Sequence, residues 1–198
     1  MSYLSHDERH QMILETAVSI AFSEGLTAMT VRRIAQEAQI AVGQIHRHFS
    51  SASELKSEAF LLTVTQSLAL MNKSGVQEDA SALKMISWCL FTENLEEARH
   101  YSKLWKEAEV ISYQDDVMRS AFRTALNQWH TALVYLLETG IKKGEFTVKR
   151  PTETVAWDCI AYSCGLDGIY NLRMENFGEK EYQTHTAAFL KSQLDIYQ

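Results

Sequence analysis

Apolar positions in this chain of 198 residues recur every three or four residues along most of its length. This is the spacing of helices that bury one face. In residues 7–24, for example, Ile13, Ala17 and Ile20 fall on one helical face, and Gly25 follows as a helix stop. The chain has only 1 proline and 8 glycines, too few turn residues for a sheet-rich protein. We therefore expect an all-α protein.

Two short amphipathic segments follow the first helix. Thr30 can cap one of them by accepting a backbone N–H, and Ile34 and Ala38 lie four residues apart on its inner face. After a tight turn, Ile45 and Phe49 have the same spacing. The residues that we expect to point outward from this last helix are Gln44, Arg47 and His48, with His46 to one side. The pattern predicts two short helices joined by a turn, the arrangement of a helix-turn-helix.

Longer helices are expected over the rest of the chain. They lie near residues 52–73, 79–92, 94–110, 114–143, 152–175 and 179–196. Ser51 and Glu54 have the spacing of a capping box at the start of the first of these helices. Pro151 suits the first turn of the helix that follows it.

The chain is acidic as a whole but locally basic. Its net charge is −6, whereas residues 30–49 carry three arginines against Glu37 alone. Residues 57–198 hold 14 basic and 19 acidic side chains. A small cationic surface on an acidic body suits a local anionic partner. A solvated helix face that happens to be basic explains the charge equally well.

The cysteines and the hydropathy of the chain indicate in which cellular compartment we expect it. The three cysteines, Cys89, Cys159 and Cys164, have no CxxC spacing and lie in apolar helical contexts, where buried free thiols are usual. We find no signal peptide and no apolar run of about 18 residues that could span a membrane. A cytoplasmic protein without a membrane partner is the simplest expectation.

The basic segment also carries a specific motif. It reads TVRRIA over residues 30–35, then Glu37-Ala38, Ile40, Gly43, Ile45, Arg47-His48-Phe49, Ser51 and Glu54-Leu55. In order and spacing, residues 10–60 resemble the N-terminal DNA-binding domain of the TetR family of bacterial transcriptional regulators. The resemblance covers roughly a quarter of the chain. It implies a homodimer that binds a palindromic DNA operator, usually as a repressor, and that a small ligand releases.

Three positions depart from the family pattern. Gln39 stands where the family commonly has glycine, and a left-handed backbone there costs a non-glycine residue on the order of 1–2 kcal/mol. His46 stands where a tyrosine often contacts phosphate, and Ala52 where a lysine is usual. Lys56, one turn later, can replace that lysine.

The resemblance divides the chain into a DNA-binding domain over residues 1–52 and a ligand-binding and dimerisation domain over residues 53–198. For the first domain, we expect Gln44 and Arg47 to read base edges and Val42 to pack on a thymine methyl. Gly43 lets the helix approach the DNA backbone. The residues expected at the phosphates are Thr30, His46, His48 and Lys56, with Arg32 and Arg33 at backbone or bases. The alternative for each is an exposed residue without a role.

The second domain is expected to pair two copies and to bind an effector. The dimerisation candidates are Trp157, Ala161, Gly165, Gly168, Phe189, Leu190 and Leu194; ordinary intrachain packing is the alternative. The effector candidates are Trp88, Phe91, Trp105, Met118, Phe122, Asn127, Trp129, Asp158 and Tyr162. Aromatic residues at helical spacing are more often core than pocket. If these residues do line a pocket, the effector is lipophilic or aromatic.

Two other classes of function compete with this one. An enzyme needs converging titratable groups, and the sequence has no HExxH motif, phosphate loop or nucleophile elbow. His6 and His10 have metal-compatible spacing, but no third ligand is apparent, so we expect no metal and no cofactor. A helical adaptor for another protein is the second rival. Salt distinguishes it, because DNA binding weakens steeply as salt rises.

Overall fold

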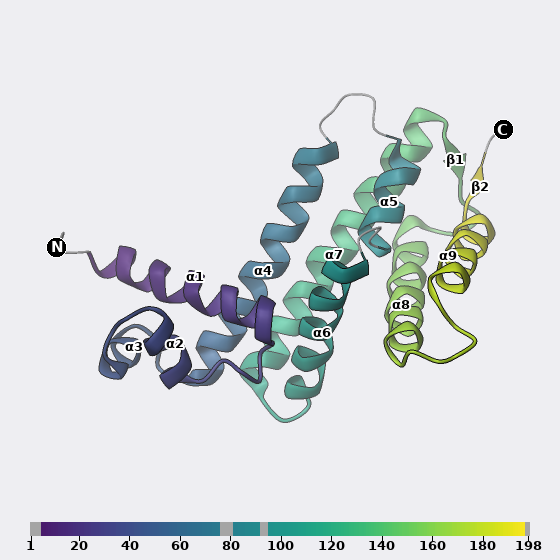
Figure 1. The fold of residues 1–198 in the computed structure, drawn as a ribbon. Helices are drawn as coiled ribbons and strands as arrows, with labels where there is room; N and C mark the ends of the chain where they lie inside the picture. Colours follow the sequence, from purple (N-terminus) through teal and green to yellow (C-terminus); the bar gives the residue numbers. More distant parts are fainter. Residues whose placement is uncertain (1–4, 76–80, 92–94, 197–198) are drawn as a thin grey trace. The chain divides into compact units, whose positions relative to one another are not determined.

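The computed structural model describes residues 5–75, 81–91 and 95–196. The described residues form nine helices and two very short strands, so the expected all-α class is confirmed (Figure 1). The helices are α1 His6–Glu24, α2 Val31–Glu37, α3 Val42–His48, α4 Ala52–Gly75, α5 Ala82–Leu90, α6 Leu95–Ser112, α7 Asp116–Lys143, α8 Thr152–Asn171 and α9 Glu179–Gln193. The strands are β1 Phe146–Thr147 and β2 Asp195–Ile196.

The chain forms two compact units. Unit 1 comprises residues 1–67 and 100–126, and unit 2 comprises residues 68–99 and 127–198. Helices α4, α6 and α7 therefore contribute residues to both units. These are units of packing, and the functional division after residue 52 stays a prediction.

Within unit 1, helices α1, α2 and α3 form a three-helix head. Ile13 of α1, Ile34 of α2 and Ile45 of α3 are almost fully buried, as their helical spacing predicts. Phe49, just after α3, is 2% exposed and belongs to the same core. Because each head helix buries only one narrow face, its other faces remain at the surface.

The turn after α1 is tied to α6. Gly25 caps α1 with φ of +100°, a backbone conformation that favours glycine. The Glu107 carboxylate accepts hydrogen bonds from the Thr27 backbone N–H at 3.1 Å and from the Thr27 hydroxyl at 3.3 Å. Lys103 Nζ donates to the Glu24 carbonyl oxygen at 2.7 Å. Two side chains of α6 therefore hold the end of α1 and the turn that follows it.

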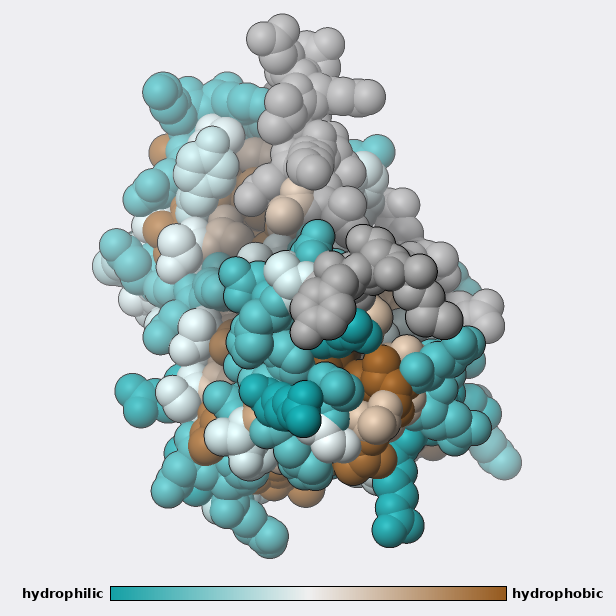
Figure 2. Space-filling model, turned by 90° about the vertical axis from the view of Figure 1, so that its left-hand side faces the viewer, coloured by the Kyte–Doolittle hydropathy of each residue, from teal (hydrophilic) through white to brown (hydrophobic). Residues whose placement is uncertain are grey.

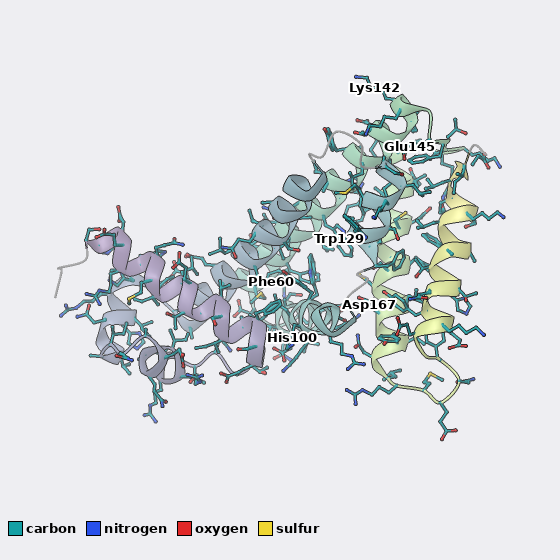
Figure 3. All side chains as sticks on the ribbon, turned by 45° about the horizontal axis from the view of Figure 1, so that its top comes forward. Phe60, His100, Trp129, Lys142, Glu145 and Asp167 are labelled. Carbon is teal, nitrogen blue, oxygen red and sulfur yellow. The ribbon has the colours of Figure 1, made fainter. Side chains whose placement is uncertain are left out.

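A second core in unit 1 is aromatic. Phe60 of α4 is fully buried, and its ring centroid lies 5.2 Å from Trp105 and 6.0 Å from Phe122 (Figure 3). Asp115 caps the start of α7 by accepting from the backbone N–H groups of Val117 and Met118, both at 3.0 Å. These contacts fix α4, α6 and the first turns of α7 within unit 1.

Within unit 2, α5 receives its N-terminal cap from a residue distant in sequence. The Glu145 carboxylate accepts from the N–H groups of Ala82 at 2.9 Å and Leu83 at 3.1 Å, and from the Ser81 hydroxyl at 2.7 Å (Figure 3). Burial opposes ionisation of Glu145, but these bonds outweigh it and lower its pKa. At the other end of α5, the buried Ser163 hydroxyl of α8 donates to the Leu90 carbonyl at 2.7 Å.

The two-residue strands are a feature that helical periodicity did not predict. Phe146 pairs with Ile196 and Thr147 with Asp195 in an antiparallel bridge. The Phe146 ring is fully buried against α7, where a Cβ at Gly140 would lie 2.2 Å from it. Packing of this ring therefore requires glycine at position 140 and places the bridge beside it.

Several predicted helix ends shift in the structure. Helix α8 ends at Asn171 rather than near residue 175, and α9 ends at Gln193 because Leu194 leads into β2. Pro151 is the N-cap of α8 and precedes its first turn. Part of the expected helix 79–92, residues 79–80 and 92, lies outside the described residues. Terminal turns are where sequence periodicity gives the weakest signal.

Candidate nucleic-acid interface

The head places a capped helix before the turn. The Thr30 hydroxyl accepts a hydrogen bond from the Arg33 backbone N–H at 3.1 Å, which confirms the predicted cap of α2. The exposed Thr30 side chain thus lies at the surface beside the first turn of α2.

The turn between α2 and α3 contains a left-handed residue. Gln39 has φ of +53°, and two hydrogen bonds close the end of α2 around it. The Ile40 N–H donates to the Ala35 carbonyl at 3.0 Å, and the Gln39 N–H donates to the Gln36 carbonyl at 3.2 Å. This is a Schellman motif, in which glycine is the usual residue at the left-handed position. The backbone at Gln39 is therefore strained, as expected for a residue other than glycine in the left-handed conformation.

Replacing Gln39 with glycine is expected to raise the free energy of unfolding by about 0.5–1 kcal/mol. Glycine removes the cost of the left-handed conformation, and its greater unfolded-state entropy cancels only part of the gain. Urea denaturation of the purified protein measures the change. The matched control is Gln36→Gly, three residues earlier in the regular helix, where glycine lowers stability by about 1 kcal/mol. A loss of stability in Gln39→Gly would contradict the assignment of strain.

Helix α3 presents an exposed face with little apolar bulk. Val42 is 39% exposed, and Gly43, His46 and Arg47 are also exposed, whereas Gln44 is half-buried. A Cβ built at Gly43 meets no atom of the described residues within 4 Å, so none of them requires glycine there. Ala41 at the N-cap makes no side-chain cap hydrogen bond. The start of α3 can therefore be approached closely from outside.

Two neighbouring arginines of α2 behave differently. Arg32 is exposed, whereas the guanidinium of Arg33 donates to Glu24 and to Glu37, both at 2.7 Å. The hydrogen bond to Glu24, followed by that to Glu37, raises the pKa of Arg33. Arg33 joins the last turn of α2 to the end of α1, and its charge is shared with two carboxylates.

His48 lies inward, which differs from its expected outward direction. Its ring centroid is 4.3 Å from that of His6 and 6.2 Å from that of His10, both on α1. Its Nδ1 atom is buried and has no hydrogen-bond partner among the described residues. Burial, and then the nearby charges of His6 and His10, lower the pKa of His48. The reason is helical phase, because His48 lies three residues after the buried Ile45 and so shares its side of α3.

The start of α4 only partly follows the predicted capping box. The Ser51 hydroxyl accepts from the Glu54 N–H at 3.0 Å, as expected, but the Glu54 carboxylate accepts from the backbone N–H of Ser50, not of Ser51. Hydrogen bonds from the Ser50 hydroxyl and N–H lower the pKa of Glu54. Lys56 is half-buried one turn later.

The sequence of the head matches a known family. Residues 13–59 match the family model described as "Bacterial regulatory proteins, tetR family". Over these residues the chain is similar to the TetR family.

Relatives of this chain support a regulatory role. It is 29% identical over 147 residues to the HTH-type transcriptional repressor KstR2 of Mycobacterium tuberculosis, a match that covers 71% of this chain and 70% of the relative. The names of the family and of this relative indicate a transcriptional regulator and not an enzyme. TetR-family regulators bind DNA and small-molecule effectors.

Solved structures share the fold. A transcriptional regulator from Saccharomonospora viridis, solved with choline, has a TM-score of 0.75 at 19% identity, covering 96% of this chain and all of the other. FadR from Bacillus subtilis, solved with stearoyl-CoA, has a TM-score of 0.62 at 17% identity, covering 92% of this chain and 96% of the other.

The expected effector residues of this chain fall in both units. In unit 1, Trp105 and Phe122 pack in the aromatic core at 5.5 Å between ring centroids, and Met118 is fully buried. The candidates in unit 2 are Trp88, Phe91, Asn127, Trp129, Asp158 and Tyr162. Trp129 Nε1 donates to the Cys89 carbonyl at 3.2 Å, and Asp158 accepts from Arg150 at 2.5 Å. Several candidates therefore already have intrachain packing or polar partners.

The expected dimerisation residues separate by exposure. Trp157, Ala161 and Gly165 are exposed on α8, and Gly168 is partly exposed. Leu190 and Leu194 are instead buried within the chain, at 7% and 1% exposure, so they have no side-chain surface to offer a second copy. Phe189 stacks on Tyr162 with ring centroids 3.9 Å apart. The α9 candidates thus belong largely to intrachain packing.

Two negative findings apply to the described part of the chain. None of its helices combines the length and hydropathy needed to cross a membrane. Across residues 5–75, 81–91 and 95–196, no group of three or more His, Cys, Asp or Glu side chains is arranged to hold a metal ion.

Proposed function

We propose that this protein is a ligand-responsive repressor that binds a palindromic operator as a homodimer. The open N-terminal end of α3 supports the proposal most directly. Gly43 has free space around its Cβ position, and the exposed Val42 and Arg47 lie on the same short helix. An α-helix fits the major groove, where a small residue lets the backbone approach and an arginine can reach guanine.

Roles within the proposed interface follow from exposure. Gln44 and Arg47 read base edges, and Val42 packs against a thymine methyl. Thr30, Arg32, His46 and Lys56 contact phosphates, which fixes the register of the head on the duplex. Arg33 and His48 support the head from within, because the first is paired with two carboxylates and the second packs against α1.

The face that Figure 2 turns towards the viewer is the side of unit 1 that carries α1–α3, and hydrophilic residues dominate it. Its hydrophobic residues gather in small groups. Such a surface suits the polar, wet contact that proteins make with DNA. It does not favour the broad apolar contact of an adaptor protein.

The second copy is proposed to pack on an exposed stripe of α8. The stripe consists of Trp157, Ala161, Gly165, Gly168, Ile169 and Leu172, which recur at helical spacing. Trp157, Ile169 and Leu172 are 43%, 42% and 73% exposed, and a Cβ at Gly165 or Gly168 would meet nothing within 4 Å. Small residues between larger apolar ones allow a second helix to approach closely. Dimerisation sets the separation of two recognition helices, about 34–36 Å for adjacent turns of DNA.

The effector is proposed to be lipophilic or aromatic. The expected effector residues are mainly aromatic in both units, a composition that suits such a ligand. Structural neighbours were solved with choline and with stearoyl-CoA, so the fold accommodates ligands of different kinds. To move a population from 1:99 to 99:1, the effector must prefer one state by roughly 5.5 kcal/mol.

Selection of genomic fragments by the purified full-length protein tests the proposed function. We expect enrichment of a palindromic sequence whose affinity falls steeply as salt is raised, because phosphate contacts release counterions. Enrichment without a palindrome would contradict the dimeric mode. Binding without sequence preference at moderate ionic strength would contradict the proposal as a whole.

A further inference from the structure

Three imidazole rings meet where α1 passes the end of α3. His6 and His10 lie one helical turn apart on α1, and their ring centroids are 4.3 Å and 6.2 Å from that of His48. His10 also stacks on Phe49, with 4.4 Å between ring centroids. We call His6, His10 and His48 the histidine seam. It connects the last residue of the proposed recognition helix to α1.

In this position the neutral form of the His48 ring is lower in free energy than the protonated form. Its Nδ1 atom is buried without a partner among the described residues. A neutral imidazole can leave that nitrogen as an unprotonated acceptor, whereas a protonated ring carries a donor on both nitrogens. A buried charged donor without an acceptor is strongly disfavoured.

The charges around the seam increase this preference. Arg9 on α1 and Arg47 on α3 act on His48 with the same sign as a proton on its ring. Two carboxylates lie close to the other two members of the seam: Asp7 is 3.4 Å from His6, and Glu58 of α4 is 3.4 Å from His10.

Glu54 of α4 also interacts electrostatically with His10. Burial and the neighbouring positive groups therefore disfavour a proton on His48.

We propose that the histidine seam makes the head acid-sensitive: a proton taken up by His48 drives its ring out of the seam and loosens the end of α3 from α1. Since the folded state disfavours this proton, the seam stabilises the head above the ordinary histidine pKa of about 6.5. That stabilisation is lost as pH falls below this value. The proposal adds regulation to the proposed function, because Arg47 lies beside His48 and operator binding then weakens on acidification.

Hydrogen exchange of the full-length protein without DNA tests the seam. The exchange of α3 amides is compared at pH 7.5 and pH 5.5 after correction for the intrinsic pH dependence. We expect protection to be lower at pH 5.5 than at pH 7.5, because the folded head disfavours the His48 proton more than the opened head does. His48→Phe keeps an aromatic ring but does not titrate, so its protection is expected to be equal at both values.

The matched control is His100→Phe. His100 stacks on Phe22 in the same unit, with 5.2 Å between ring centroids, and lies outside the seam. This variant is expected to lose protection on acidification as the unchanged protein does. Equal protection of the unchanged protein at both pH values, or an undiminished loss in His48→Phe, overturns the proposal.

A second variant keeps the proposal testable if His48→Phe does not fold. His6→Asn removes a neighbour that lowers the pKa of His48, so the loss of protection between pH 7.5 and pH 5.5 is expected to be smaller than in the unchanged protein; an equal or larger loss overturns the proposal. Because neither measurement involves DNA, failure of the seam and failure of the proposed function are distinguished.

Discussion

Replacing Arg47 with alanine is expected to weaken binding of the selected operator by at least about 30-fold. A bidentate arginine–guanine contact contributes roughly 1–3 kcal/mol, and a homodimer makes it twice. Arg47 is exposed on α3, so its removal leaves no cavity and the thermal stability should stay unchanged. Fluorescence anisotropy with a labelled operator at fixed salt and pH 7.5 measures the effect, and the variant should also discriminate less among substitutions at the contacted base pair.

The control for Arg47→Ala is Arg123→Ala. Arg123 is an exposed arginine on α7, outside the head, and its replacement removes the same charge. Only the small change due to net charge is expected there. If both variants bind equally well, or if Arg47→Ala weakens all duplexes without loss of sequence preference, Arg47 does not read a base.

Gly165→Arg is expected to convert the proposed homodimer to monomers. The monomer tolerates the new side chain, because nothing lies within 4 Å of its Cβ and arginine favours a helix over glycine by about 0.8–1 kcal/mol. In the dimer, however, the arginine would place an unpaired charge between two closely packed helices, at a cost of roughly 3 kcal/mol or more. The dimer dissociation constant should rise at least about a hundredfold. Analytical ultracentrifugation around the 22.6 kDa monomer mass measures it.

Gly165→Ala is the matched variant for this test. It also favours the helix but adds only a methyl group, so it should keep the dimer largely intact. Loss of operator affinity in Gly165→Arg with an unchanged mass would mean that the stripe acts in some way other than dimerisation. A dimer in both variants would show that α8 does not form the dimer interface.

Local features of the head could be predicted because they depend on neighbouring residues. The Thr30 cap follows from side-chain chemistry within a few positions. The left-handed conformation of Gln39 could be expected only from the glycine that is common there in the family pattern. The inward direction of His48 also follows from helical phase, because His48 lies three residues after the buried Ile45. Its meeting with His6 depends on how two helices cross, which periodicity does not specify.

The sequence pattern alone does not distinguish apolar residues that are buried within one chain from those that are buried between two copies. Leu190 and Leu194 have helical spacing that suits either, and only the structure places them in the interior of unit 2. The hydrogen bonds that Thr27 donates to Glu107 join residues 80 positions apart, as tertiary contacts often do. No local pattern marks such partners, because the backbone path between them decides whether they meet.

The cap on α5 has a consequence for the order of events during synthesis. The N–H groups of Ala82 and Leu83 donate to the carboxylate of Glu145, which lies 63 and 62 residues further along the chain. At about 5–20 residues per second, Glu145 is added roughly 3–13 s after Ala82. The nascent chain must therefore reach Glu145 before the first turn of α5 can acquire its native hydrogen bonds.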